Sequence, residues 1–212
     1  MAPSDPRDPP EANPGPAPEV TPARGATLAP WGLRRRVLVA AICGVIFVSH
    51  TINHARRGDA WEIFWACTWV PLMVGAAALT GSARLNAVGL VWLALGNLLW
   101  LFDLLAGGAW MWTSTLTHWG ALALGLWAAR WLGYPRGSWW RAHLLLLGWQ
   151  QLTRLFTPPG RNINVAFSIH PASRDHFSSF AVYWITLFFL DALIMYAGER
   201  LYRRLLPAPP AA

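Results

Sequence analysis

Six long apolar runs, separated by short polar breaks, dominate the sequence from residue 37 onward. Each run is close to the twenty residues that an α-helix needs to cross the hydrocarbon core of a bilayer. A transmembrane β-barrel would instead show ten-residue segments in which apolar and polar residues alternate. The runs are residues 37–55, 60–80, 84–106, 112–132, 138–156 and 178–201. The pattern therefore predicts an all-α polytopic membrane protein with six transmembrane helices.

The two ends of the chain do not share this pattern. Residues 1–30 contain nine prolines and no long apolar run, so they cannot bury enough surface to fold. We expect a disordered cytoplasmic tail over residues 1–32, a six-helix transmembrane domain over 33–205, and a short C-terminal tail over 206–212. A cleaved signal peptide is the alternative interpretation of the first run, but a long proline-rich segment precedes it.

Composition and charge agree with a membrane protein. The chain is 55% hydrophobic and only 13% charged, and it contains 15 tryptophans, whereas soluble domains carry about 25% charged residues. All 17 basic residues are arginine, which excludes lysine Schiff-base chemistry. Because the arginines flank the apolar runs, lipid phosphates and membrane topology explain the net charge of +7. No nucleic-acid partner and no cofactor are predicted.

The distribution of arginines predicts the orientation in the membrane. Cytoplasmic loops of membrane proteins are enriched in Arg and Lys. With the N-terminus in the cytoplasm, ten of these arginines fall on the cytoplasmic side and five on the opposite side. The cytoplasmic set is Arg34, Arg35, Arg36, Arg84, Arg130, Arg136, Arg141, Arg200, Arg203 and Arg204. We therefore expect a multi-pass protein of the cell membrane with both termini in the cytoplasm.

Polar side chains gather at one depth in the outer half of the predicted bundle. Cys67 and His118 each lie about seven residues into their runs, so both are roughly 10 Å below the outer surface. His50, Asp103 and Gln150 fall slightly nearer that surface by the same counting. Ionisable residues inside a membrane are costly, and they commonly mark functional sites.

The first chemistry that fits this layer is nucleophilic catalysis. Cys67 would be the nucleophile, His118 the general base, and Asp103 the group that orients the imidazole. The structural alternatives are that Cys67 is a small apolar filler and that His118 only makes an interhelical hydrogen bond.

Two other arrangements remain open. His50 and His54 lie at positions i and i+4 of one helix face, and with Glu62 they could hold zinc or iron. Alternatively, Thr115 or Thr117 could supply a hydroxyl nucleophile near His118, although such hydroxyls usually bond to helix carbonyls.

The connection over residues 157–177 is the only long one between the runs. It mixes apolar with polar residues, which favours a packed lid over the outer layer rather than a solvated loop. Arg154 and Arg161 suit a lipid phosphate, because guanidinium groups bind phosphate through paired hydrogen bonds. Asn162 and Gln150 could stabilise the oxyanion of an acyl-transfer reaction.

Several short motifs follow one another in a characteristic order. They are Cys67, the histidine of an apolar run (His118), the turn over residues 133–141, the segment 160–164, Pro171, and the pair Tyr183 and Trp184. This order resembles the YwaF-like family of six-span bacterial membrane proteins, over about residues 60–200. The resemblance implies lipid-directed acyl transfer by a cysteine and a histidine, for which Cys67 and His118 are the matching positions. The family carries a histidine shortly before its cysteine, where this chain has Trp65.

The sequence thus predicts an integral membrane acyltransferase or ester hydrolase whose partner is a membrane phospholipid. The alternatives are a metal-dependent membrane hydrolase and a non-catalytic membrane protein, either a small-solute carrier or an assembly partner. A carrier needs a polar path on both sides of the midplane, and the inner half of the runs is nearly apolar. The pattern makes no prediction of the oligomeric state.

Overall fold

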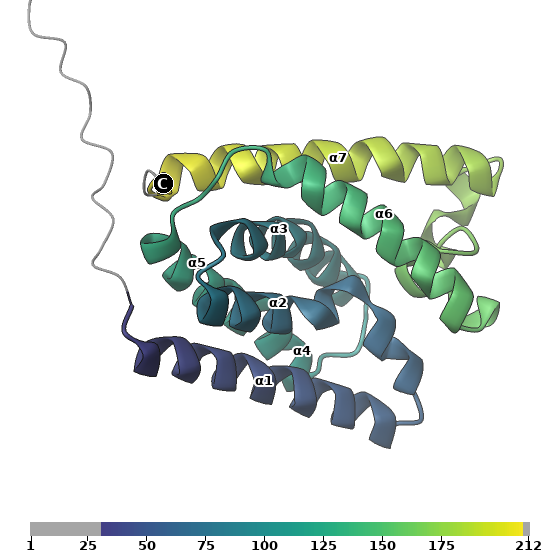
Figure 1. Ribbon diagram of the computed structural model, residues 1–212. Helices are drawn as coiled ribbons and strands as arrows, with labels where there is room; N and C mark the ends of the chain where they lie inside the picture. Colours follow the sequence, from purple (N-terminus) through teal and green to yellow (C-terminus); the bar gives the residue numbers. More distant parts are fainter. Residues whose placement is uncertain (1–30, 210–212) are drawn as a thin grey trace, which may run out of the picture.

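The computed structural model describes residues 31–209, and this part of the chain is helical without any β-strand (Figure 1). The predicted disorder of residues 1–30 lies outside the described residues. The helices are α1 (Leu33–Arg56), α2 (Ala66–Thr80), α3 (Ala83–Leu105), α4 (Trp112–Thr115), α5 (Ala121–Leu132), α6 (Ser138–Phe156) and α7 (Phe180–Leu205). A π-helical turn, η2 (Leu116–Gly120), joins α4 to α5, and the 3-10 turns are η1 (Ala60–Phe64), η3 (Pro159–Arg161), η4 (Ile163–Val165) and η5 (Pro171–His176).

Successive helical stretches run in opposite directions, with α1 and α7 on opposite sides of α2 and α3 (Figure 1). The beginning of α1 and the end of α7 lie at the same end of the bundle. The connection between α6 and α7 lies at the other end, which we call the loop end. This arrangement matches the alternation that the six apolar runs predict.

Helix α3 forms the centre of the bundle, because it packs against α2, α5, α6 and α7. Its fully buried Leu90 and Leu93 meet Val70 and Val74 of α2 in the apolar core. Glycine allows one close approach: a Cβ atom at Gly125 of α5 would come within 2.9 Å of the Leu90 side chain.

Polar side chains also connect the central helix to its neighbours. The Asn86 amide donates to the Gly125 carbonyl at 2.9 Å, and the Trp92 indole donates to the Ala142 carbonyl at 2.8 Å. Interhelical hydrogen bonds of this kind stabilise helix packing inside membranes.

Three helices are long and apolar enough to cross a membrane: α1, α3 and α7. All six predicted runs are helical, but three of them do not meet this standard alone. Helix α2 has 15 residues, or roughly 22 Å, because the 3-10 turn η1 replaces its predicted start. The π turn η2 divides the fourth run, and α6 contains polar residues such as Arg141, Gln150 and Arg154.

The outer surfaces of α1 and α7 are strongly apolar. Val45 of α1 and Phe189 of α7 are both 66% exposed, and many other large apolar side chains of these helices are exposed as well. Soluble monomers rarely expose apolar surface on this scale. The exposed surface is therefore compatible with a membrane protein.

Both predicted tails contain residues that pack against the bundle. Trp31 is buried, with its ring centroid 4.7 Å from that of Trp127 and 4.4 Å from that of Trp131. At the other end of the chain, the Tyr134 backbone N–H donates to the Pro207 carbonyl at 2.8 Å. The packed region thus extends beyond the predicted limits of 33 and 205 on both sides.

Candidate functional site

His118 lies in the π turn η2, inside an otherwise α-helical stretch. Turns of this type are rare and often occur at functional sites. The imidazole is 4% exposed and stacks on Trp100 at a centroid distance of 5.4 Å. Its Nδ1 atom lies 3.0 Å from the amide oxygen of Asn97. An amide oxygen only accepts hydrogen bonds, so this contact favours the tautomer of His118 that carries its proton on Nδ1.

Cys67 lies near this histidine, and Gly96 of α3 lies between the two residues. A Cβ atom built at Gly96 of α3 would be 3.6 Å from Cβ of Cys67 and 3.6 Å from Cε1 of His118. The absent side chain of Gly96 therefore leaves the space between the two residues open. The structure brings the predicted nucleophile and base together, although no hydrogen bond joins them within residues 31–209; such bonds often form only with substrate bound.

The start of α2 places the cysteine where a negative charge is favoured. Cys67 is the second residue of the helix, and Trp65 before it is extended. The first N–H groups of a helix have no partner within it, and the helix dipole is positive at this end. Burial in an apolar site opposes a thiolate, so a neighbouring proton acceptor is needed to form it.

Asp103 does not lie at the imidazole. It is exposed near the end of α3, where a Cβ atom at Gly108 would come within 2.7 Å of its carboxyl carbon. Asn97, six residues earlier on α3, takes the position predicted for Asp103. Sequence reasoning missed Asn97, whose only signal is that it is a single polar residue in the middle of an apolar run.

The side chains of the metal alternative do not form a ligand cluster. Nδ1 of His50 lies 3.1 Å from the hydroxyl of Thr113, and the His50 and His54 rings meet edge to face at 4.5 Å. Across residues 31–209, no three His, Cys, Asp or Glu side chains come close enough together to hold a metal ion, Glu62 included.

The hydroxyls of the third alternative bond to their own helix. Thr117 donates to the Thr113 carbonyl at 3.0 Å, and Thr115 donates to the Met111 carbonyl at 3.3 Å. Both groups therefore have backbone partners in the described structure, as hydroxyls inside helices usually do.

The connection between α6 and α7 is packed, with Ile163 and Ala166 fully buried. Asn162 stabilises its shape. This residue has a φ of 45°, its side-chain oxygen accepts from the N–H groups of Phe167 and Ser168, and its amide donates to the Ser168 carbonyl. The middle of the predicted lid, residues 162–169, is thus buried or half-buried against the bundle, whereas residues 158–161 and 174–176 are exposed.

The other predicted binding residues have protein partners too. The Gln150 amide donates to the Asn164 carbonyl at 3.0 Å, and its oxygen accepts from the Trp184 indole at 2.8 Å. Arg154 donates to the Ala166 carbonyl at 2.6 Å, and Arg161 forms an ion pair with Asp59 at 2.7 Å. The structure brings these residues to the loop end, where their polar groups hold the connection in place.

Asn164 links this connection to the cysteine. Its side-chain oxygen accepts from the Ala66 N–H at 3.0 Å, and its amide donates to the Phe64 carbonyl at 2.7 Å and the Thr153 hydroxyl at 2.8 Å. The backbone φ of 52° is in the left-handed region, which asparagine tolerates better than most residues. Asn164 therefore fixes the chain immediately before Cys67, and the sequence alone gave it no special role.

No protein-family model, no curated protein and no solved structure matches the chain. The resemblance to the YwaF-like family therefore remains a prediction from the short motifs, and the geometry of the site is the basis for a functional proposal.

Proposed function

We propose that the protein is an integral membrane enzyme that transfers or hydrolyses an acyl group of a phospholipid. Cys67 is the nucleophile, His118 the general base, and Asn97 the residue that orients the imidazole. One observation carries the proposal: Cys67 and His118 both lie against Gly96, and the side chain of Asn97 hydrogen-bonds to Nδ1 of His118. The same order of nucleophile, imidazole and amide serves in cysteine hydrolases of unrelated fold.

The reaction has two steps. The imidazole of His118 takes the thiol proton of Cys67 as general base while the sulfur attacks the ester carbonyl carbon of the lipid. The tetrahedral intermediate then loses the lysophospholipid alkoxide, to which His118 returns the proton. In the second step, an acceptor hydroxyl or water attacks the thioester, and its proton passes through His118 to the departing Cys67 sulfur.

The membrane supplies the substrate in this proposal. All six helical stretches cross the bilayer, α2 and α6 as shorter or more polar spans enclosed by the bundle, and both termini are cytoplasmic. The exposed apolar surfaces of α1 and α7 support this arrangement, and so does the alternation of helix direction (Figure 1). Cys67 and His118 then belong to the outer half of the membrane.

The test uses a phospholipid that carries a chloromethyl ketone on one acyl chain, added to purified protein. Mass spectrometry of peptides should find the adduct on Cys67, and His118→Ala should reduce its rate of formation at least tenfold. Cys43, which is fully buried in the core, is the internal control. Equal modification of both cysteines, or a rate that does not depend on His118, would make Cys67 a packing residue of a non-catalytic protein.

Orientation is tested separately. In a variant with Cys43→Ala and Cys67→Ala, a single cysteine replaces exposed Asp175 at the loop end or Ala208 beyond α7. A membrane-impermeant thiol reagent should label the first in intact cells and leave the second unlabelled. The reverse result would invert the topology.

A further inference from the structure

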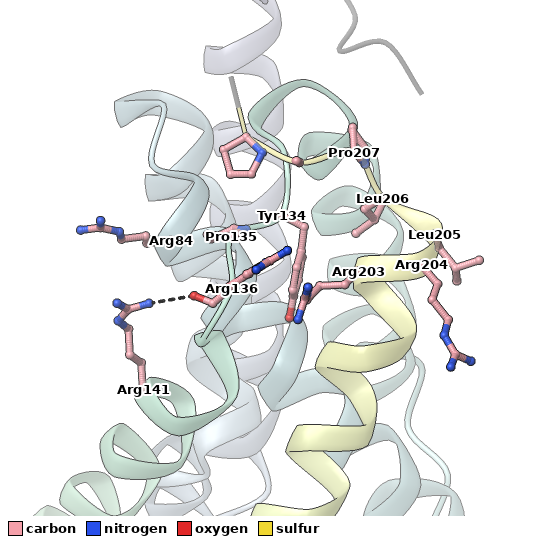
Figure 2. A pocket seen from close by; sticks show the side chains of 12 residues that line it. Arg84, Tyr134, Pro135, Arg136, Arg141, Arg203, Arg204, Leu205, Leu206 and Pro207 are labelled. Carbon is pink, nitrogen blue, oxygen red and sulfur yellow. Dashed lines mark hydrogen bonds between the residues drawn. The ribbon is translucent and has the colours of Figure 1, made fainter. Parts of the chain in front are cut away.

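A second polar region lies at the end of the bundle opposite the loop end. A cavity of about 570 Å³ lies between the turn that precedes α6 and the end of α7. Figure 2 shows the side chains that line it. Five arginines line it: Arg84, Arg136, Arg141, Arg203 and Arg204. We call this cavity the arginine pocket. It contributes nothing to the arrangement of Cys67 and His118.

The walls of the pocket are held by specific contacts. The Glu199 carboxylate accepts from the backbone N–H groups of Gly137 at 2.9 Å and Trp139 at 2.8 Å, which fixes the start of α6 against α7. Gly133 has a φ of 73°, and a Cβ atom there would overlap the backbone of Pro209. The segment after α7 therefore packs closely on the turn before α6, and the pocket is a built feature of the fold.

Most of the positive charge in the pocket has no carboxylate partner among residues 31–209. Glu199 is the only carboxylate with a contact to the lining arginines in the described structure, 4.0 Å from Arg203, and both its oxygens already accept backbone N–H groups. Among residues 31–209, Arg84 and Arg136 form no ion pair. The preference for cytoplasmic arginine sets the side of the membrane, but it does not require arginines from four separate segments to line one cavity.

The hydroxyl of Tyr134 lies buried beside these arginines. The side chain is 3% exposed, lines the pocket, and its hydroxyl has no hydrogen-bond partner within the described residues. Figure 2 shows the hydroxyl end of the ring beside Arg203. Burial raises the pKa of the Tyr134 hydroxyl above its ordinary value, so the group keeps its proton at neutral pH. Buried polar groups in native structures usually have a partner, supplied by protein, water or ligand.

We propose that the arginine pocket binds the phosphate of an anionic phospholipid headgroup. Guanidinium groups bind phosphate oxygens through paired, charge-assisted hydrogen bonds. The rim also includes Leu205, which is 68% exposed and continues the apolar surface of α7 toward the pocket. A ligand with both a phosphate and an acyl chain fits this combination better than a soluble phosphate ester does. The site is distinct from Cys67 and independent of any reaction there.

The test measures lipid binding to the purified full chain by native mass spectrometry in detergent. Phosphatidylglycerol and phosphatidylcholine are titrated in parallel, and only the first should bind specifically. Replacing the pair Arg136→Gln and Arg203→Gln should weaken phosphatidylglycerol binding about tenfold or more, as expected for the loss of charge-assisted contacts. Tyr134→Phe should weaken it several-fold and leave the fold intact.

The matched control removes the same charge at the loop end, by Arg56→Gln with Arg57→Gln, and should leave phosphatidylglycerol binding within twofold of the original protein. A loss equal to that of the pocket variant would show non-specific electrostatic attraction and overturn the proposal. Arg84→Gln with Arg136→Gln, which touches no ion pair, repeats the test if the first variant does not fold. Strong competition by glycerol 3-phosphate would identify a soluble phosphate ester and overturn the lipid assignment.

Discussion

The two ends of the bundle differ in whether the protein itself supplies partners for their polar side chains. At the loop end, Gln150, Asn162 and Asn164 all hydrogen-bond to the protein. Gln150 and Asn164 join the connection between α6 and α7 to the rest of the bundle, and Asn162 bonds within the connection. At the opposite end, Arg84 and Arg136 reach a cavity without an ion pair in the described structure (Figure 2). Polar groups that the protein satisfies maintain its structure, whereas a charged cluster that it leaves open is suited to a ligand.

The contrast also bears on the expectation from the sequence about phosphate binding. Arg154 and Arg161 were the predicted phosphate ligands, and the structure pairs the first with a carbonyl and the second with Asp59. Arginines assigned to topology alone line the cavity at the opposite end. A count of charges along the chain predicts which connections are cytoplasmic. It does not show which arginines already have a partner within the protein.

The largest effect on stability should come from breaking the loop end at Asn164. Asn164→Ala removes three hydrogen bonds and leaves the Ala66 N–H and the Phe64 carbonyl without this partner. It also places alanine in the left-handed region. We expect a loss of about 2–4 kcal/mol in the free energy of unfolding, measured by chemical denaturation in detergent.

Asn164→Gly separates the two causes, because glycine tolerates the positive φ but restores no hydrogen bond. It should recover about 1 kcal/mol of the loss. A midpoint of unfolding for Asn164→Ala equal to that of the original protein would show that the loop end is not held by this residue.

The corresponding change at the opposite end is Glu199→Gln. The amide keeps one oxygen to accept a backbone N–H, but it presents N–H groups to the second donor, so one buried bond is lost. We expect a loss of about 1–2 kcal/mol in the free energy of unfolding. The exposed carboxylate of Asp175 provides a control, since Asp175→Asn should change stability by less than about 0.5 kcal/mol. Similar values for the two variants would contradict the structural role of Glu199.

The sequence predicts the helical stretches well and their contacts less well. Apolar runs of about twenty residues indicate helices directly, so α1, α3 and α7 begin and end near the expected positions. The start of α2 was wrong, because Asn164 and Trp149 hold residues 64–66 by hydrogen bonds from far along the chain. No local pattern carries that information.

The sequence predicts at which level along the helices the site residues lie, but not which side of its helix each side chain faces. Counting residues along a helix placed Cys67 and His118 at the same level, and the structure brings them together around Gly96. The partner of His118 was missed because the count does not give the rotation of each helix, and the π turn changes that rotation further. Asn97 therefore faces the imidazole, while Asp103 points to the end of α3.

Between the two ends, the site itself is tested by Gly96→Ala. The added methyl group would lie at van der Waals distance from both Cys67 and His118, so it fills the space between them without a clash. We expect modification of Cys67 by the lipid chloromethyl ketone to slow about tenfold, equivalent to about 1.4 kcal/mol in the barrier. Gly89→Ala, on the same helix and also facing α2 at ordinary distances, should leave the rate unchanged. Equal rates for both variants would show that the reactivity of Cys67 does not depend on its approach to His118.

The smallest expected effect concerns the ion pair at the loop end. Arg161 and Asp59 lie 2.7 Å apart, but their side chains are 44% and 40% exposed, so water and salt screen the attraction. A double-mutant cycle with Arg161→Ala and Asp59→Ala should give a coupling of at most about 1 kcal/mol in the free energy of unfolding. The coupling should fall further in 1 M salt, because the screening length is then only about 3 Å.

Because Arg161 already has a partner, Arg161→Ala should also leave phosphatidylglycerol binding unchanged. A coupling well above 1 kcal/mol would show that the pair holds the connection to η1, and a loss of lipid binding would move the phosphate site from the arginine pocket to the loop end.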